Sequence, residues 1–382
     1  MRIAVPTEHD PDERRVALVP EVVRKLSGRG IELAIERGAG ERALISDAAF
    51  EEAGAVIVDS AEVWKSDVVI TIAPPQPEQI ASMNEGSLLI GFLAPLTSAP
   101  TAAAARDAKV TAFAMEAVPR ISRAQAIDAL SSQSNVAGYE AVIIAAEELT
   151  RFFPMLMTAA GTIPPAKVLV LGAGVAGLQA LATARRLGAV VTGYDVRPEV
   201  SEQVESLGAS FLDLGIEASG DGGYARELSD EERAAQQQAL NEAITGFDVV
   251  ITTALVPGRP APKLISAAAV EGMRAGSVIV DLAGESGGNC ELTVAGEKTI
   301  IDGVTILSPL NLPAQMPEHS SQLYARNVLA LLDLMINDGE EGAATTLEPD
   351  FEDEIISGSC IAKSGEIVHP GAKAAVEGAA GV

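Results

Sequence analysis

The sequence has few cysteines, histidines and aromatic residues. Its 382 residues include 2 Cys, 3 His and 1 Trp, and aromatic residues make up only 3% of the chain. Cys290 and Cys360 lie far apart without metal-ligand spacing, so no disulfide framework or metal site is predicted, a pattern typical of a reducing compartment. Because aromatic side chains are scarce, the core must be built from Val, Ile, Leu and Ala, and the chain length favours two domains.

Positive charge is also scarce. The 27 Lys and Arg residues against 53 Asp and Glu residues give a formal net charge of -26. Such a chain repels nucleic acids and anionic lipids at long range, so we predict neither as a partner. A dinucleotide is an anion too, but the N–H groups of a helix N-terminus can hold it against the unfavourable overall field. A highly soluble surface or an adaptation to salty surroundings explains the acidity itself.

Long hydrophobic runs are absent as well. The most apolar late stretch, residues 328–336, is too short to span a membrane and contains Asp333. Met1 leads directly into a short β-strand pattern, unlike the charged start and long apolar core of a secretory signal. We therefore expect a soluble, cytoplasmic protein without direct membrane insertion, and a separate membrane-embedded partner remains open.

Short apolar runs alternate with helical patterns along the chain. The apolar runs lie at residues 2–6, 32–36, 55–59, 67–72, 87–93, 110–115, 168–171, 190–195, 248–255, 277–283 and 304–309. This alternation predicts doubly wound parallel sheets with both faces covered by helices. We therefore predict an α/β fold with two Rossmann-like domains, the second inserted in the first. The first comprises residues 1–130 plus 311–382, and the second comprises residues 131–310.

Four connecting segments have weaker patterns. Helical spacing of apolar residues over 136–146 predicts a long helix that crosses between the domains. Residues 157–167, which contain Gly and Pro, are predicted to be an irregular lead into the next strand. Near the C-terminus we predict a hairpin around Lys363–Gly365 and a frayed tail over 372–382.

The most informative stretch is residues 167–195. An apolar run is followed by Gly172, Gly174 and Gly177, a helical segment, and a second apolar run that ends at Asp195. The first glycine permits a tight turn, the second leaves room for a pyrophosphate, and the third lets helix and strand pack closely. Because strand, helix and acid all occupy the required positions, we predict a dinucleotide site rather than a chance helix cap.

Asp195 lies 23 residues after Gly172, where the adenosine ribose of a dinucleotide would bind. The alternative is a solvated strand end. A carboxylate here repels a 2′-phosphate and favours NAD over NADP, although Arg197 nearby weakens that inference. Farther along, Leu255 follows another apolar strand and is interpreted either as a contact for the adenine or ribose or as a core leucine.

Polar residues gather in the segment 119–133. The candidates for holding a nicotinamide carboxamide are Arg120, Arg123, Gln125, Asp128, Ser131 and Ser132. A Gln beside an Arg and an Asp can match the acceptor and the two donors of a carboxamide. Alternatively, Ser122 and Gln125 form a helix capping box, and on these residues alone that is the simpler interpretation.

The histidines His9, His319 and His369 all lie away from the strand ends beside the glycine turn. A dehydrogenase that converts an alcohol or an amine to a carbonyl needs a proton acceptor at the reacting carbon. A hydride that passes from one nicotinamide ring to another needs none, so alignment and exclusion of water would be the whole of the local catalysis.

Several motifs together resemble proton-translocating NAD(P) transhydrogenases. They are PRISRAQAIDALSSQSNVAGYEAV, TAAGTIPPAKVLVLGAGVAGLQA, YDVRPEV, GDGGYA, TTALVPGRPAPKLI and SVIVDLAGESGGNCE. The resemblance covers nearly the whole chain and is to the separately encoded NAD(H)-binding portion of the alpha subunit. It implies a homodimer that docks on an NADP(H)-binding component and on a membrane-embedded proton-channel component, peripheral to the cytoplasmic membrane. It also implies direct hydride transfer from NADH to NADP⁺.

The resemblance also implies roles for individual residues. It places the nicotinamide-binding loop on Arg120, Gln125, Asp128 and Ser131. It places the NAD(H) contacts on Gly172, Ala173, Gly174, Val175, Gly177, Asp195, Val196, Arg197, Gly223, Gln236 and Leu255. It therefore favours Gln125 as a ligand over a cap, and the glycine-rich segment 215–225 as a mobile lid over an ordinary loop.

The same fold is similar to alanine dehydrogenase. That family places a substrate-binding Lys after its fourth strand and a catalytic His at the end of the next, but residues 67–75 and 88–95 contain neither. Arg15 remains where that family has its carboxylate-binding arginine. We expect no oxidation of alanine, and a third interpretation is an NADH-sensing module without enzymatic activity.

Overall fold

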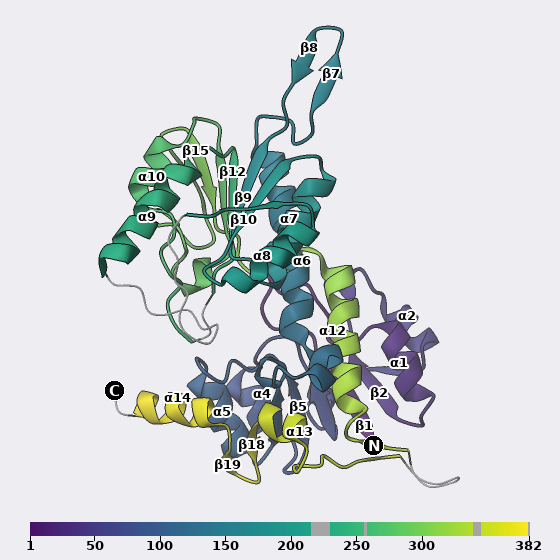
Figure 1. Cartoon of the computed structure of the whole chain (residues 1–382). Coiled ribbons are helices and arrows are strands. Elements are labelled where there is room, and N and C mark those ends of the chain that lie inside the picture. The colour runs from purple at the N-terminus through teal and green to yellow at the C-terminus, as the bar shows by residue number, and fades with distance from the viewer. Residues whose placement is uncertain (215–229, 256–257, 339–344, 381–382) are drawn as a thin grey trace. The chain divides into compact units, whose positions relative to one another are not determined.

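The computed structural model describes residues 1–214, 230–255, 258–338 and 345–380 (Figure 1). The chain forms two compact units. Unit 1 comprises Met1–Gln133 and Pro313–Val382, and unit 2 comprises Ser134–Leu312. Each is built on a largely parallel sheet with helices on both faces, which confirms the predicted α/β class with two doubly wound, Rossmann-like domains.

Unit 1 contains an eight-stranded sheet in the order β19-β18-β6-β5-β4-β1-β2-β3. Its strands are β1 (Arg2–Val5), β2 (Glu32–Glu36), β3 (Ala55–Val58), β4 (Val68–Ile70), β5 (Leu88–Gly91), β6 (Thr111–Ala114), β18 (Cys360–Lys363) and β19 (Glu366–Ile367). The first six pair in parallel, whereas β18 and β19 form an antiparallel edge that includes the predicted hairpin. Ile3 and Val5 enter the core on one face and Ala4 enters the core on the other.

Helices cover both faces of this sheet. They are α1 (Pro20–Ser27), α2 (Asp47–Glu52), α3 (Ser60–Val63), α4 (Pro77–Ala81), α5 (Ala99–Asp107), α12 (Pro317–Leu332), α13 (Glu354–Ser359) and α14 (Pro370–Ala380), with 3-10 turns η1 (Glu41–Ala43), η2 (Met115–Ala117) and η3 (Ser122–Ile127). The predicted long helix is α6 (Ala129–Glu148), within which the chain passes from unit 1 to unit 2. In the described part of the chain, none of the helices is long and apolar enough to cross a membrane.

Unit 2 contains a seven-stranded sheet in the order β11-β10-β9-β12-β13-β15-β14. Its strands are β9 (Lys167–Leu171), β10 (Val190–Tyr194), β11 (Ser210–Phe211), β12 (Val249–Thr252), β13 (Val278–Asp281), β14 (Lys298–Ile301) and β15 (Val304–Leu307), of which β14 alone is antiparallel among those described. Its other elements are α7 (Val175–Arg186), η4 (Pro198–Val200), α8 (Ser201–Ser206), α9 (Asp230–Ile244), α10 (Ala267–Gly272) and η5 (Gly284–Ser286), and α11 (Leu312–Gln315) follows at the unit boundary.

Two connecting segments differ from their predictions. The predicted irregular lead at 157–167 contains an antiparallel hairpin, β7 (Leu156–Thr158) and β8 (Gly161–Ile163), because Gly161 with φ +127 permits the reversal. The predicted frayed tail is mostly helix α14, since Pro370 starts the helix and Ala372 is buried against unit 1. A further short pair, β16 (Ile336–Asn337) and β17 (Thr346–Leu347), lies in unit 1.

Candidate functional site

The glycine turn joins β9 to the N-terminus of α7 in unit 2. Gly172 has φ +101, a conformation that other residues rarely adopt, and its N–H donates to Tyr194 O at 2.8 Å. A Cβ on Gly177 would lie 1.8 Å from Gly172 O, so only glycine permits this packing of helix and strand. A Cβ on Gly174 would meet no atom of the described residues within 4 Å. The open space in front of the helix N-terminus therefore fits a pyrophosphate.

Asp195, directly after β10, is tied to this turn. Its carboxylate accepts hydrogen bonds from Ala173 N at 2.8 Å and from the backbone N and the Nε and Nη2 atoms of Arg197 at 2.9 to 3.0 Å. Burial opposes ionisation, but these hydrogen bonds outweigh it and hold the pKa of Asp195 below its ordinary value. A ribose hydroxyl can bind this carboxylate only by sharing it with Arg197 or displacing Arg197.

The neighbouring strand β12 brings a second segment to the same turn. β9 and β12 pair at the point where the strand order reverses, which is where open α/β sheets bind ligands. Thr253, just after β12, donates from Oγ1 to Gly172 O at 3.0 Å. The side chain of Leu255 is 54% exposed, so the interpretation as a core leucine is wrong.

The other cofactor-binding candidates of unit 2 lie next to the glycine turn and Asp195, on α9, or outside the described residues. Val175 opens α7 and Val196 follows Asp195, and both side chains are exposed. Gln236 lies on α9 and is half-buried. Gly223, and with it the whole predicted lid at 215–225, lies outside the described residues, so the lid stays a prediction.

The four nicotinamide candidates lie in unit 1, around η3 and the start of α6. The N-cap of η3 is Ile121 and no side chain caps it, so the predicted capping box of Ser122 and Gln125 is wrong. Arg120 and Gln125 are both exposed, and the side chain of Gln125 bonds to no residue that the structure describes. Gln125 is therefore free to meet a ligand.

The true cap lies at the start of α6. Asp128 accepts hydrogen bonds from Ser131 N at 2.9 Å and Ser131 Oγ at 2.6 Å, which satisfies a free N–H of the first turn. The sequence contains both an S-x-x-Q and a D-x-x-S spacing within ten residues. The second forms the cap because the helix begins at Ala129, after Asp128.

Two helices hold this loop in place. Arg123 pairs with Asp353, directly before α13, through two bonds of 2.7 and 2.9 Å. Asn327 on α12 donates to Ala126 O at 2.8 Å and accepts from Ser132 Oγ at 2.7 Å. Arg123 and Ser132 thus serve the loop's structure, while Arg120 and Gln125 stay exposed.

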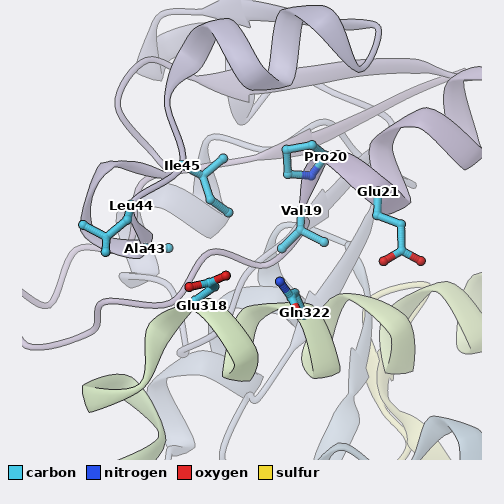
Figure 2. A pocket seen from close by; sticks show the side chains of 8 residues that line it. All are labelled: Val19, Pro20, Glu21, Ala43, Leu44, Ile45, Glu318 and Gln322. Atoms are coloured by element: carbon cyan, nitrogen blue, oxygen red, sulfur yellow. The ribbon is translucent and has the colours of Figure 1, made fainter.

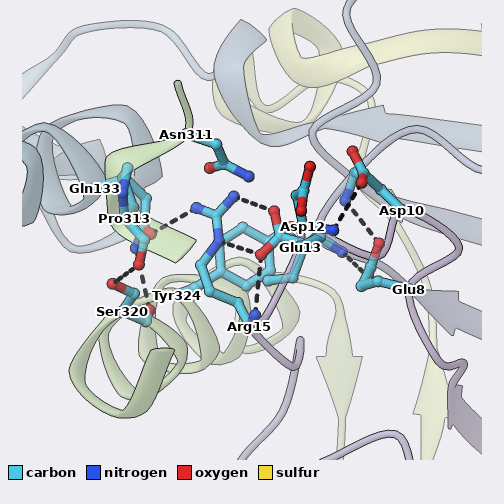
Figure 3. Close-up of polar contacts among 12 residues, drawn as sticks. Glu8, Asp10, Asp12, Glu13, Arg15, Gln133, Asn311, Pro313, Ser320 and Tyr324 are labelled. Atoms are coloured by element: carbon cyan, nitrogen blue, oxygen red, sulfur yellow. Dashed lines mark hydrogen bonds and ion pairs between the residues drawn. The ribbon is translucent and has the colours of Figure 1, made fainter. Parts of the chain in front are cut away.

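The carboxyl ends of the strands in unit 1 are occupied by the chain itself (Figure 3). Glu8, after β1, accepts hydrogen bonds from Ile72 N at 2.6 Å and Ala73 N at 3.1 Å, just after β4. Burial raises the pKa of Glu8 to about 7 despite these bonds. Beside it, the fully buried Tyr324 donates to Thr71 O at 2.7 Å.

A second carboxylate acts in the same way one strand farther along. Glu116, after β6, accepts from Leu93 N at 3.3 Å and Ala94 N at 2.6 Å, just after β5. Burial raises the pKa of Glu116 as well. The loops that follow β4 and β5 thus both bind internal carboxylates.

Arg15 is buried and paired within unit 1. Its Nε and Nη2 atoms donate to the two carboxylate oxygens of Glu13 at 2.7 and 2.6 Å, and its Nη1 donates to Gln133 Oε1 at 2.8 Å (Figure 3). The side chains of Arg15 and Glu13 are only 7% and 2% exposed. Gln133 in turn donates to Ser320 O at 3.1 Å. The positive charge of Arg15 is therefore neutralised by its own chain.

A separate pocket of about 290 Å³ lies elsewhere in unit 1, between the start of α1, η1 and α12 (Figure 2). It is lined by Val19, Pro20, Glu21, Ala43, Leu44, Ile45, Glu318 and Gln322. The charged groups in this lining are carboxylates, so the pocket does not suit an anionic dinucleotide. Among the described residues, no group of three or more His, Cys, Asp and Glu side chains could hold a metal ion.

Two residues of unit 2 that the sequence did not single out occupy its interior at the carboxyl end of β13. Asp281 accepts from Thr252 Oγ1 at 2.9 Å, Cys290 N at 3.0 Å and Thr293 Oγ1 at 2.7 Å. Asn289 is fully buried beside it. Both lie in the SVIVDLAGESGGNCE motif of the family resemblance, but that motif alone assigned neither residue a role.

Comparison with known proteins places both halves of the chain in one family. The profiles of the alanine dehydrogenase/PNT family match residues 4–137, as its N-terminal domain, and 141–370, as its C-terminal domain. The chain is 48% identical over 381 residues to the separately encoded first portion of NAD(P) transhydrogenase subunit alpha from Rhodospirillum rubrum, covering 97% of this chain and 98% of that protein.

Solved structures show the same relationship. A transhydrogenase from Sinorhizobium meliloti superposes with a TM-score of 0.84 at 40% identity, covering 97% of this chain and 99% of that one. An L-alanine dehydrogenase superposes with a TM-score of 0.79 at 28% identity, covering 99% of each chain. The chain is thus more similar to the transhydrogenase than to the alanine dehydrogenase.

Proposed function

Because the chain belongs to the alanine dehydrogenase/PNT family, we propose that it is the NAD(H)-binding component of a proton-translocating NAD(P) transhydrogenase. It passes a hydride from NADH to NADP⁺ held on a partner component. The similarity to a transhydrogenase subunit over nearly the whole of both chains supports this proposal.

The observation that carries the proposal is the pairing of Arg15 with Glu13 inside unit 1. An amino-acid dehydrogenase must bind a free carboxylate substrate, and Arg15 is the group that would do so. Here the Nε and Nη2 donors of Arg15 are taken by Glu13 inside the protein, and a second carboxylate would enter a site already charge-balanced. A free carboxylate substrate bound by Arg15 is therefore disfavoured as the partner in hydride transfer. A nucleotide held on a partner component is favoured instead.

The residues of unit 2 fit a dinucleotide and would hold it. Gly172, Gly174 and Gly177 shape the turn at the start of α7, where free N–H groups stabilise the pyrophosphate. Asp195 accepts from the ribose hydroxyls, and Leu255 packs against the adenosine. Ala173, Val175, Val196, Arg197, Gln236 and Gly223 complete the proposed set of contacts.

The residues of unit 1 would orient the nicotinamide ring. When bound, NADH supplies the hydride, and no proton moves between the two rings. Arg120 and Gln125, both exposed, bind the carboxamide, while Asp128 and Ser131 keep the loop and the start of α6 in place. Their contribution to rate is alignment of the ring and exclusion of water.

Reconstitution tests the proposal directly. The purified chain is mixed with an NADP(H)-binding component and its membrane component, and hydride transfer from NADH to an NADP analogue is followed. We expect transfer that depends on all components, and no reduction of NAD⁺ by alanine with the chain alone. Tight NADH binding without transfer to any such partner, or alanine-dependent NAD⁺ reduction, would overturn the proposal.

An NADH-sensing module is the competing proposal, and Gln125→Asn separates the two. This change shortens the side chain by one methylene and so misplaces the amide against the ring. We expect a loss of transfer rate of about 100-fold with a modest loss of NADH affinity. A module that only senses NADH has no transfer rate to lose.

We also propose that the chain is a homodimer, supported by the β7–β8 hairpin. Figure 1 shows this hairpin extending away from the sheet of unit 2. Met157 is 72% exposed and Ile163 is also exposed, and an isolated hairpin is marginally stable in water. A second copy would cover these side chains. Met157→Asp should give monomers by light scattering, whereas Leu44→Asp, an exposed leucine in unit 1, should not.

The partner components would place the chain at the cytoplasmic face of the membrane. The family resemblance supports this location through docking on the membrane-embedded proton-channel component. Co-sedimentation of the chain with vesicles that contain that component, and not with empty vesicles, is the expected result. Binding to empty vesicles would contradict it.

A further inference from the structure

Asn289 stands at a reversal of the chain after β13. Gly287 and Gly288 before it have φ +95 and +79, a backbone that other residues rarely adopt. The reversal turns Asn289 back into the interior of unit 2, where its side chain is fully buried. A buried amide must find hydrogen-bond partners, because leaving it unpaired is costly.

The partners of this amide are the two ends of one segment, Ala254–Pro262, which the structure describes apart from residues 256–257. Oδ1 of Asn289 accepts from Ala254 N at 3.1 Å, and Nδ2 donates to Ala254 O and to Pro262 O, both at 2.8 Å. Both donors of the amide are thus used, and the reverse orientation would set N–H against N–H. One side chain therefore fixes both ends of the segment.

The same segment is continuous with the glycine turn. Thr253 donates from N to Leu171 O at 2.9 Å and from Oγ1 to Gly172 O at 3.0 Å. On the other side of Ala254, the Leu255 side chain is exposed at the strand edge. Asn289 thus determines where the backbone runs between the turn and the exposed leucine.

We propose that Asn289 is a positioning residue for the adenosine half of NAD(H), an inference that rests on the proposed function. Its buried amide does not touch the cofactor. It holds Ala254, and with it Leu255, in the conformation that binds adenosine. A segment fixed in advance binds more tightly because less of its freedom is lost on binding.

A purely structural role is the alternative, and Thr293 provides the matched control. Thr293 belongs to the same region after β13, and its Oγ1 donates to the buried Asp281 carboxylate at 2.7 Å. Thr293→Val removes a partly buried hydrogen bond without changing a residue that contacts the Ala254–Pro262 segment. It should lower thermal stability and leave cofactor affinity unchanged.

The experiment measures the Kd of the full-length chain for NADH and for ADP-ribose, which lacks the nicotinamide. Asn289→Ala should weaken both ligands by the same factor, about tenfold or more. In the reconstituted system it should raise the KM for NADH by a similar factor while kcat stays within about twofold. Thr293→Val should leave the Kd for NADH, the Kd for ADP-ribose and the KM for NADH unchanged.

Two results would overturn the role of Asn289. One is a folded Asn289→Ala chain with the wild-type Kd for both ligands, and the other is an equal loss of affinity in Thr293→Val. If Asn289→Ala does not fold, Asn289→Ser, which keeps one donor, takes its place and must show a smaller loss in the same direction. A wild-type chain that binds no NADH would instead overturn the proposed function.

Discussion

The two sheets of the molecule follow one plan but treat the carboxyl ends of their strands in opposite ways. In unit 1, Glu8 and Glu116 bind the backbone N–H groups that follow β4 and β5. In unit 2, a glycine turn follows β9, and the position of a Cβ on Gly174 meets no atom within 4 Å. Among the described residues, the edge where such sheets bind ligands is therefore filled in unit 1, whereas in unit 2 the space beside Gly174 is open.

The contrast shows that strand order locates a possible site and that side chains decide whether it exists. Both units offer backbone N–H groups at the point where the strand order reverses. In unit 1 an internal carboxylate has taken them. In unit 2, Gly174 has no side chain to cover the N–H groups at the start of α7. Asn289 and Thr253 hold the neighbouring segment in place.

The largest effects are expected at the glycine turn of unit 2. Gly174→Ala places a methyl group in open space, so the fold is unchanged but the methyl occupies the position of the pyrophosphate, and NADH affinity should fall by about 100-fold. Gly177→Ala should lose the same affinity and also lower the thermal midpoint, since its Cβ would lie 1.8 Å from Gly172 O. Calorimetry of both ligand binding and unfolding separates the two variants. Normal NADH binding by Gly174→Ala would contradict a pyrophosphate bound against Gly174.

The closed edge of unit 1 should appear in the pH dependence of stability. The pKa of Glu8 is raised to about 7 from 4.5 by burial, beside Glu13, Arg15 and Tyr324. As pH rises from 5 to 8 the unfolded chain releases this proton first. The free energy of unfolding should therefore lose roughly 3 kcal/mol through Glu8.

Denaturant unfolding at several pH values gives the free energy of unfolding of the wild type and of Glu8→Gln. The difference between the two curves is the contribution of Glu8. The glutamine variant should lack that part of the decline, so its stability relative to the wild type rises with pH. The exposed control Glu52→Gln on α2 should follow the wild type. Parallel curves for Glu8→Gln and the wild type would show that Glu8 is ionised at neutral pH.

A smaller effect is expected at Asp195, which we propose selects NADH over NADPH. Asp195→Asn removes the charge that repels a 2′-phosphate and frees Arg197 from its ion pair. NADH affinity should fall by about tenfold and NADPH affinity should rise, as measured by fluorescence titration with both. Glu199→Gln, a nearby exposed carboxylate, is the control. An unchanged ratio of the two affinities would remove Asp195 from selectivity.

The smallest effect is expected at Arg123, which lies in the proposed nicotinamide loop but pairs with Asp353. Its ion pair with Asp353 is half exposed to solvent. Arg123→Gln should shift the thermal midpoint by no more than about 2 °C and leave NADH affinity unchanged. A large loss of NADH affinity would instead make Arg123 a ligand alongside Arg120 and Gln125.

The sequence predicts those parts of the fold that depend on local pattern. Apolar runs such as residues 2–6 and 168–171 become the central strands because a buried parallel strand has a continuous hydrophobic signature. The hairpin at 156–163 escapes prediction because its exposed strands are short and contain Gly and Thr. The helix at 370–380 escapes prediction because its residues are mostly Ala and Gly, whose small side chains give only a weak apolar pattern.

The candidate site is predictable only where its residues are adjacent in sequence. The glycine turn and Asp195 are joined by one strand and one helix, so their spacing reveals them. The pairing of Arg15 with Gln133 joins residues 118 positions apart, and Glu8 reaches residues 64 and 65 positions away. Such contacts depend on tertiary packing, so the sequence alone could not show that the edge of unit 1 is closed.

The Glu8 side chain acts like a covalently attached anionic ligand of unit 1. Because it is tethered beside the N–H groups of Ile72 and Ala73, it competes at a fixed local concentration that no dilution lowers. An anion from solution must compete for these N–H groups with the Glu8 carboxylate, which stays attached to the same chain. Any other anion at this edge of unit 1 could therefore bind Ile72 N and Ala73 N only after the Glu8 side chain had moved away.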